Sequence, residues 1–196
     1  MHISDGIIST PISIVANVAA LGLVYATGRK TTAEEIPRMG MTGAALFVVS
    51  LIHFPVAGSS IHLGLFGLAG IILRHRAFPV VFTVLLFQSL IFQHGGLLAI
   101  GVNALNMGAG AYAAWMIWRI AVMPSYLKAI LAGLTGILIP ASLMVLEFRV
   151  TGYGASIALL LTVYMLAAFI EGGITLSAVM FLHKVKPDIL NVRVHE

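Results

Sequence analysis

The sequence has no cysteine and few charged residues. The absence of Cys from all 196 positions excludes disulfide bonds and thiolate metal sites. Asp, Glu, Lys and Arg make up 9% of the chain, whereas a soluble domain carries about 25%. Hydrophobic residues make up 60%, and the mean hydropathy is +1.04. This composition indicates one integral membrane domain, residues 1–196, without an attached soluble domain.

Several functional motifs are also missing. No G-x-x-x-x-G-K-[ST] phosphate loop occurs, so we expect the chain not to hydrolyse ATP itself, and no H-E-x-x-H metalloprotease motif is present. The first residues lack the basic region and short apolar core of a cleaved signal peptide. The net charge of +4 does not argue for nucleic acid, because basic residues in a membrane protein first report orientation.

Charge-free stretches predict an all-α protein with seven transmembrane helices. A spanning helix needs about 20 mostly apolar residues. The stretches 39–73 and 77–118 are too long for one span, and "HFPVAGSSIH" and "QHGGL" break them at proline and paired glycines. The predicted spans are residues 10–27, 39–55, 60–74, 78–93, 97–118, 127–147 and 155–183. The sequence "EGG" at 171–173 is a candidate site for a kink in the last span.

The distribution of basic residues predicts an outer N-terminus and a cytoplasmic C-terminus. With seven spans and the N-terminus outside, ten basic residues lie inside and only Arg149 outside. A single span across 39–73 would reduce this bias to seven against four. The ten inner residues are Arg29, Lys30, Arg38, Arg74, Arg76, Arg119, Lys128, Lys184, Lys186 and Arg193.

Four histidines are predicted at the outer membrane face. His2, His53, His62 and His94 come from the N-terminus and from the loops after the second and fourth spans. Any one of them alone reads as an interfacial or hydrogen-bonded histidine. Four on one side of a small bundle indicate a metal site, because imidazole is a common ligand for nickel, copper, zinc and cobalt.

The opening hexapeptide "MHISDG" offers a chelate of its own. The amine of Met1, the amide nitrogen of His2 and the imidazole Nδ1 of His2 can bind one ion through two fused rings. All-nitrogen, square-planar coordination is typical of nickel(II) or copper(II). A bulky second residue disfavours removal of Met1, and a fourth nitrogen is still needed. The alternative is a disordered outer terminus.

Further polar residues lie in apolar surroundings. Gln88, Gln93, His94, Asn103 and Asn106 either orient metal ligands through hydrogen bonds or pin helices together. The candidates to support the ligands are Asp5, His53, Ser59, Ser60, His94 and Asn103. The glycines of "GSSIHLGLFGLAG" predict close helix packing.

Glu171 is the single acidic residue well inside a predicted span. Its position nearer the inner face makes it a poor candidate for the histidine site. It pairs with an inner arginine, braces the seventh helix or contacts a partner, and the sequence does not choose between these roles.

Five ordered motifs resemble the NikM/CbiM family, the substrate-binding membrane subunits of energy-coupling-factor (ECF) transporters for nickel and cobalt. They are "MHISDGIIS", "GSSIHLGL", "LLFQSLIFQHGG", "GVNALNMG" and "EGGIT…VKPDIL". The resemblance implies seven helices, a metal-binding segment 1–9 inserted into the bundle, and a metal held by Met1, His2 and His62. Here "MHISDGII" stands for the usual "MHIPDGFL", and "QHGG" for "GHGG"; neither change removes a ligand.

The expected function is therefore capture of nickel(II) as a transported substrate, not as a cofactor. Cobalt(II) is the alternative, and the lack of a leader favours nickel. The resemblance implies a transmembrane coupling subunit, ATP-binding ABC subunits and a small auxiliary membrane subunit as partners, in a prokaryotic plasma membrane. The small-residue pairs Ala16–Ala20 and Gly40–Ala44 are candidate docking faces for the coupling subunit, or internal packing.

An intramembrane serine hydrolase is the alternative from another class. Ser59 or Ser60 could pair with His94. The sequence "GSSI" lacks the glycine of G-x-S-x-G, which argues against this enzyme. Alanine at both serines would separate the two classes: a hydrolase would lose activity, and a transporter subunit would retain about one nickel ion.

Overall fold

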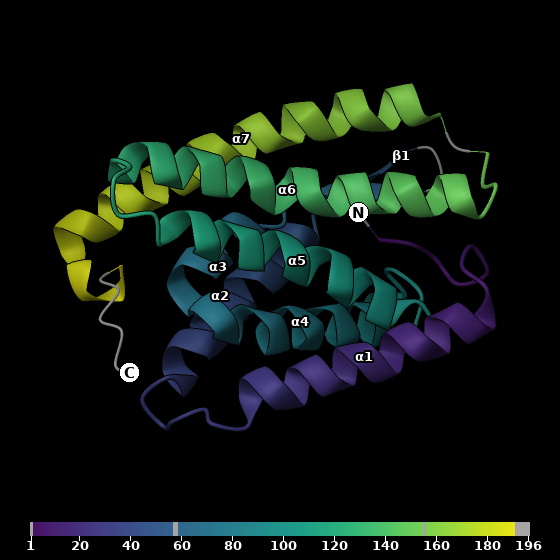
Figure 1. The fold of residues 1–196 in the computed structure, drawn as a ribbon, viewed down its shortest axis with the longest axis horizontal. Helices are drawn as coiled ribbons and strands as arrows, with labels where there is room; N and C mark the ends of the chain where they lie inside the picture. Colours follow the sequence, from purple (N-terminus) through teal and green to yellow (C-terminus); the bar gives the residue numbers. More distant parts are fainter. Residues whose placement is uncertain (1, 57–58, 155, 191–196) are drawn as a thin grey trace.

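The chain folds into an elongated helical bundle, and the computed structural model describes residues 2–56, 59–154 and 156–190, with the side chains of residues 55, 56, 59 and 60 outside that description (Figure 1). The α-helices in these residues are α1 (Thr10–Gly28), α2 (Ile36–Ser50), α3 (Phe66–Leu73), α4 (Ala77–Phe92), α5 (Ile100–Trp118), α6 (Ser125–Val150) and α7 (Ile157–Val185). The short elements are the antiparallel strands β1 (His53–Val56) and β2 (Ser59–His62) and the 3₁₀ turns η1 (Arg74–Arg76) and η2 (Pro187–Ile189).

Proline marks the start of several helices. Pro11 and Pro37 lie in the first turns of α1 and α2, and Pro124 precedes α6. Proline lacks an N–H, and the first turn of a helix leaves its N–H groups without intrahelical partners. These residues therefore begin helices without losing a helical hydrogen bond.

Helix α3 lies at the centre of the bundle because its glycines allow close backbone contact. A Cβ atom on Gly67 would lie 2.3 Å from the carbonyl oxygen of Ala132 in α6. One on Gly70 would lie 2.0 Å from the carbonyl oxygen of Ala111 in α5. The predicted packing role of these glycines is confirmed.

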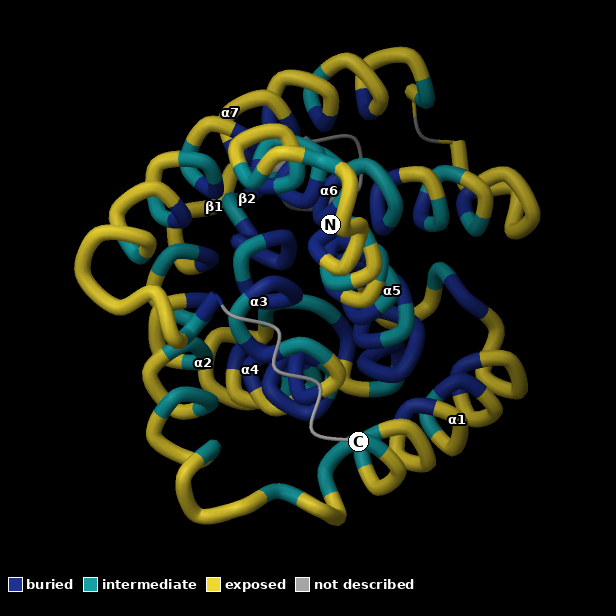
Figure 2. The backbone as a smooth tube through the Cα atoms, turned by 60° about the vertical axis from the view of Figure 1, so that its left-hand side comes forward, coloured by how far each residue is buried: buried dark blue, intermediate teal, exposed yellow. Residues whose placement is uncertain are grey.

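The outer faces of the bundle are apolar. Figure 2 shows buried positions facing the interior and exposed positions along the outward sides of α1 and α7. Val15 and Val18 on α1 are 69% and 67% exposed, and Leu166 and Phe169 on α7 are 62% and 64% exposed. Apolar surface of this extent is typical of helices that contact lipid.

The structure confirms a mainly helical chain of the membrane type, while the seven separate crossings stay a prediction. Within the described residues, four helical stretches are long and apolar enough to cross a membrane: Thr10–Gly28, Phe66–Phe92, Ser125–Val150 and Ile157–Val185. Helix α2 is a shorter apolar helix. Each predicted span overlaps one of the α-helices.

The predicted third span, 60–74, needs correction. Residues 59–62 form strand β2, and α3 has only 8 residues. At 1.5 Å per residue it rises about 12 Å, too little to cross a hydrocarbon core of about 30 Å. The end of predicted span 39–55 is also a strand, β1. Helix α7 continues through residues 171–173.

The basic turns lie together at one end of the bundle. Arg76 donates hydrogen bonds to the carbonyl oxygens of Thr27 and Lys30 and forms a 3.2 Å ion pair with Glu35. The end of α1 therefore meets the turn between α3 and α4. The start of α1 and the loops that precede α5 and α7 lie at the opposite end (Figure 1). This segregation is what the charge count predicts, and the sidedness of the chain in a membrane stays a prediction.

Candidate metal-binding site

The N-terminal segment is fixed against helix α5. The amide of Ile3 donates to Asn103 Oδ1 at 2.8 Å, and Asn103 Nδ2 donates to the carbonyl oxygen of Ile3 at 3.0 Å. Gly96 N donates to the same carbonyl at 3.2 Å. Residues 2–9 are therefore an ordered part of the bundle rather than a frayed terminus, and Asn103 supports the segment that carries His2. Met1 lies outside the described residues.

Asp5 connects this segment to the first turn of α5. Its Oδ1 accepts the amide of Ala99, the residue before the helix, at 2.9 Å. A carboxylate at this position compensates one of the amides that a helix N-terminus leaves without a partner. Asp5 thus supports the backbone near the site.

The paired glycines of "QHGG" make room for the N-terminal segment. Gly95 has φ +77, and a Cβ atom there would lie 3.0 Å from His2 Nδ1. A Cβ on Gly96 would lie 1.9 Å from Asp5 Oδ1 and 2.5 Å from Asp5 N. A side chain at either position would displace the segment that bears His2.

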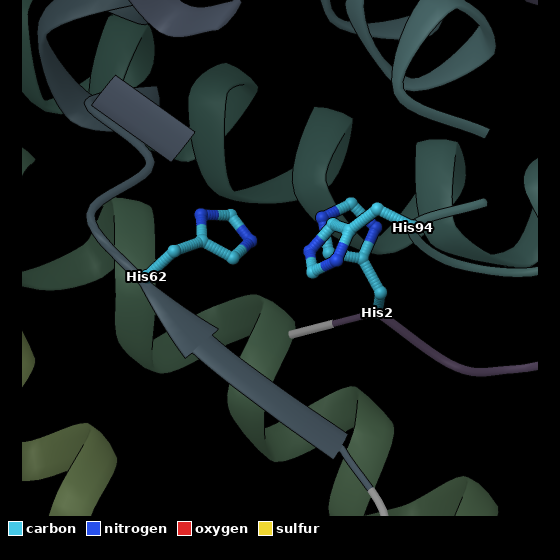
Figure 3. A group of neighbouring side chains, drawn as sticks. All are labelled: His2, His62 and His94. Atoms are coloured by element: carbon cyan, nitrogen blue, oxygen red, sulfur yellow. The ribbon is translucent and has the colours of Figure 1, made fainter. Parts of the chain in front are cut away.

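Three histidines from distant parts of the chain gather in one place. His2 lies in the N-terminal segment, His62 at the end of β2 and His94 in the loop after α4 (Figure 3). One ring nitrogen from each lies within 4.8 Å of the others. His2 and His62 are 3% and 4% exposed, and His94 is half-buried. The geometry suits a single metal ion with imidazole ligands.

His62 directs one nitrogen toward the centre of this group. Its Nδ1 donates a hydrogen bond to the carbonyl oxygen of Leu63 at 3.0 Å, so the neutral ring has its lone pair on Nε2. Nε2 is buried and has no hydrogen-bond partner among the described residues. A buried acceptor without a donor is costly unless it binds an ion. The resemblance assigned His62 as a ligand, and this tautomer suits that role.

Burial keeps these imidazoles neutral. It lowers the pKa of His2 and of His62 well below 6.5, and the neighbouring histidines lower the pKa of His2 further. Burial, followed by the charge of His53, lowers the pKa of His94 to about 4. Metal coordination requires the neutral ring. At pH 7 these side chains are therefore ready to bind without losing a proton.

His53 lies at the outer edge of the cluster. It is exposed and lies directly opposite His62 in the β1–β2 pair. Its Nδ1 donates to the carbonyl oxygen of Leu51 at 3.0 Å, and its ring centroid is 4.1 Å from that of His94. The structure brings His53 next to the site but not into the group of three.

The β1–β2 hairpin places the backbone of the two predicted serines near His62. Ser59 and Ser60 belong to strand β2, opposite Val56 and Pro55 of β1. Their suggested roles, as support for a ligand or as a nucleophile, concern side-chain atoms outside the described part of the chain.

Glu171 braces the backbone that follows His62. The residue is completely buried, and its Oε1 accepts the amides of Gly64 at 2.5 Å and Leu65 at 2.8 Å. Leu65 is the cap of helix α3. Of the three roles left open, these hydrogen bonds support the brace, which joins α7 to the backbone that follows strand β2. Glu171 is not one of the three residues whose ligand atoms gather, and that it is no metal ligand stays a prediction.

Asn106 and Gln88 each join two helices through a side-chain hydrogen bond. Asn106 Nδ2 donates to Glu147 Oε2 at 2.9 Å and joins α5 to α6. Gln88 Nε2 donates to Ser50 Oγ and joins α4 to α2. Both fit the alternative in which polar residues pin helices.

Asn17 was missed by the sequence argument. Its Nδ2 donates to the carbonyl oxygen of Leu98 at 2.9 Å, and its Oδ1 accepts the amide of Gly101 at 2.7 Å. It fixes α1 to the loop that holds the N-terminal segment. An asparagine in an otherwise apolar span is the signal that could have identified it.

The two candidate docking pairs lie in different surroundings. Ala16 and Ala20 are 8% and 0% exposed, and α1 meets α5 beside Ala16, so this pair packs inside the bundle. Gly40 and Ala44 are exposed and line an apolar groove of about 560 Å³ between α2 and α4. Only the second pair lies on an open surface.

Comparison with known proteins gives a consistent set of relatives. The family model described as "CbiM: Cobalt uptake substrate-specific transmembrane region" matches residues 2–189. A protein of Haemophilus influenzae assigned to metal transport is 30% identical, over 97% of both chains. The cobalt transport protein CbiM of Geobacter sulfurreducens is 30% identical over 97% of this chain and 61% of its own length.

A fused relative and a solved structure complete the comparison. The fused nickel transport protein NikMN of Rhodobacter capsulatus is 28% identical over 98% of this chain and 65% of its own length. The crystal structure of a transition metal transporter superposes with a TM-score of 0.82 at 23% identity, covering 94% of this chain and 93% of that one. The structural likeness establishes the shared fold.

Proposed function

We propose, since the chain belongs to the CbiM family of cobalt-uptake substrate-specific transmembrane proteins, that it captures nickel(II) at the outer membrane face for uptake. The same fold and site suit cobalt(II), which is the alternative substrate. Both ions prefer nitrogen ligands of this kind. The family assignment supports transport rather than the hydrolase considered from Ser59 and Ser60.

The observation that carries this proposal is the buried group of His2, His62 and His94. Their ring nitrogens converge within 4.8 Å, although the residues are far apart in sequence. Buried imidazoles held neutral by their surroundings form a site that binds a metal reversibly and needs no chemistry of its own. This is what a capture subunit requires.

The proposed ligands are the amine of Met1, the amide nitrogen and Nδ1 of His2, and Nε2 of His62. The buried His62 Nε2, which has no hydrogen-bond partner among the described residues, supports the fourth position. His94, close to both rings, then orients or shields the ligands. A site of three imidazoles, in which His94 is itself a ligand, is the competing arrangement.

The proposed setting is a prokaryotic plasma membrane, with seven crossings, the N-terminus outside and the C-terminus in the cytoplasm. The basic turns at one end of the bundle support this orientation. The Rhodobacter capsulatus relative is by name a fusion of nickel transport components. We therefore expect an ECF-type assembly with a transmembrane coupling subunit, ATP-binding ABC subunits and a small auxiliary subunit.

The docking face for the coupling subunit is proposed at Gly40 and Ala44. Their exposure and the groove beside them support this choice over Ala16 and Ala20. Leucine at both Gly40 and Ala44 should leave nickel binding intact and abolish both uptake and co-purification with the coupling subunit. Loss of binding together with uptake would instead identify the patch as internal packing.

The test of the function is metal retention by the purified chain. A protein that begins at Met1 and has a C-terminal tag should hold about one nickel ion, measured by elemental analysis and titration calorimetry. One residue added before Met1 should abolish retention, because the amine then becomes an amide. An extended chain that binds nickel as tightly as the native one would contradict the chelate, and a native chain that binds neither nickel nor cobalt would contradict the function.

A further inference from the structure

The bound ion would lie below the outer surface of the protein. His2 and His62 are almost completely buried, at 3% and 4% exposure. A hydrated cation must therefore exchange its water ligands for imidazole along some passage before it reaches His62 Nε2. Among the described residues, a series of neighbouring histidine rings leads from the exposed His53 toward His62.

Three imidazoles form a series of increasing burial. His53 is exposed, His94 is half-buried, and His2 is buried. The ring centroids of His53 and His94 are 4.1 Å apart, and those of His94 and His2 are 4.2 Å apart. Because His53 Nδ1 donates to Leu51, its lone pair in the neutral ring lies on Nε2 and is available to a metal ion.

A small cavity lies along the outer half of this series. It has a volume of about 150 Å³ and is lined by Ser50, Leu51, His53, Gln88, Phe92 and His94. One water needs about 10–15 Å³ of such space, so the cavity has room for several waters around a cation.

Gln88 provides a polar wall to the cavity. Its Nε2 donates to Ser50 Oγ, which fixes the orientation of the amide. Its Oε1 is buried and has no hydrogen-bond partner among the described residues. A water bound to a divalent cation is a strong hydrogen-bond donor, and this oxygen can accept from it.

We infer that His53, His94 and Gln88 form the entrance through which a divalent first-row cation reaches the site. His53 takes the ion from solvent at Nε2, Gln88 accepts a hydrogen bond from its remaining waters, and His94 passes it to His2 and His62. At each transfer the next imidazole replaces a water ligand, and the metal–nitrogen bond to the preceding imidazole breaks. The inference rests on the proposed metal capture, and it adds a kinetic role for side chains outside the final ligand set.

The test is the rate of nickel binding by the purified full-length chain, measured by stopped flow. His53→Ala should lower the association rate constant about tenfold, within the range found for variants of one binding site. An entrance residue lowers the barrier equally in both directions, so the dissociation rate constant should fall by the same factor. The equilibrium Kd should stay unchanged.

Two further variants isolate the nitrogen of His53. His53→Phe retains a ring against His94 but lacks the nitrogen, and it should be as slow as His53→Ala. His75→Ala is the matched control, because His75 is also an exposed histidine. It lies in turn η1 before helix α4, whereas His94 follows the other end of that helix. The rate constants of His75→Ala should equal those of the unmodified chain.

The measured rate constants and Kd values separate the entrance from a ligand role of His53. Unchanged rate constants in His53→Ala, or normal rates in His53→Phe, would overturn the entrance. A higher Kd with an unchanged association rate would make His53 a ligand of the final site and would also overturn it. An unmodified chain that binds no nickel or cobalt would overturn the proposed function itself. The results for the His53 variants bear on the entrance alone.

Discussion

Replacing Gly96 by alanine should displace the N-terminal segment from its place beside helix α5. The new Cβ atom would lie 1.9 Å from Asp5 Oδ1 and 2.5 Å from Asp5 N. The carboxylate could rotate away, but the backbone nitrogen could not. Since Cβ contacts below 3.0 Å are essentially not found, the two backbones must separate by about 0.5 Å, the difference between 3.0 and 2.5 Å.

This shift is large on the scale of metal coordination. Ligand distances are fixed to about 0.2 Å, and His2 is only three residues before Asp5. An extra methyl group in a packed position costs about 1–3 kcal/mol. If the segment relieves this strain by moving away from the site, nickel affinity should fall about 5- to 150-fold.

The assay is titration calorimetry of the purified chain with nickel, alongside circular dichroism. Gly96 does not have a positive φ, so the effect is steric, and helix content should stay the same. Gly22→Ala is the control, because its Cβ would have no atom within 4 Å. Adding Asp5→Ala to Gly96→Ala should not restore binding, since the clash with the backbone nitrogen remains. Affinity within twofold of the unmodified chain for Gly96→Ala would refute the reasoning.

Three other perturbations test the site. His62→Ala should reduce nickel affinity more than the 10- to 100-fold expected for His94→Ala, and equal losses in calorimetry would favour the three-imidazole site. Glu171→Ala leaves two buried amides without an acceptor and should cost at least about 2 kcal/mol of stability. Glu171→Gln retains an acceptor oxygen and should lower the thermal midpoint less. An equal fall in the two variants would contradict the brace. The lowered pKa values of His2, His62 and His94 mean that the unfolded chain binds more protons below pH 6.5. The thermal midpoint of the metal-free protein should therefore fall from pH 6.5 toward pH 4, less steeply in His94→Gln, and an identical slope in that variant would contradict the assignment.

The positions of the long helices could be predicted from the sequence because they depend on local composition. Apolar stretches of about 20 residues identify helices in lipid almost independently of tertiary contacts. The predicted spans 10–27 and 155–183 correspond to helices Thr10–Gly28 and Ile157–Val185. The β1–β2 hairpin was not predicted, since two strands of 4 residues inside an apolar stretch have no periodicity that separates them from a helix.

The site was predictable in its chemistry but only partly in its arrangement. The histidines could be identified because imidazole is rarely placed in an apolar bundle without a use. The contact between His2 and His94 depends on tertiary packing across 92 positions, and so does the backbone brace from Glu171. No local pattern specifies such contacts.

The hydrogen bonds around the N-terminal segment explain how so short a stretch could serve as part of the proposed metal site. Fixing one residue of backbone costs about 1–2 kcal/mol in conformational entropy, and a segment ordered only by the ion would subtract that cost from its affinity. Here Asn103 and Gly96 hold the backbone of Ile3, and Asp5 is held by Ala99. This entropy is therefore lost during folding of the bundle, and the proposed ligands are already in position before an ion binds. Polar residues at this end of an otherwise apolar bundle stabilise the fold and, through the same bonds, set the geometry of the site.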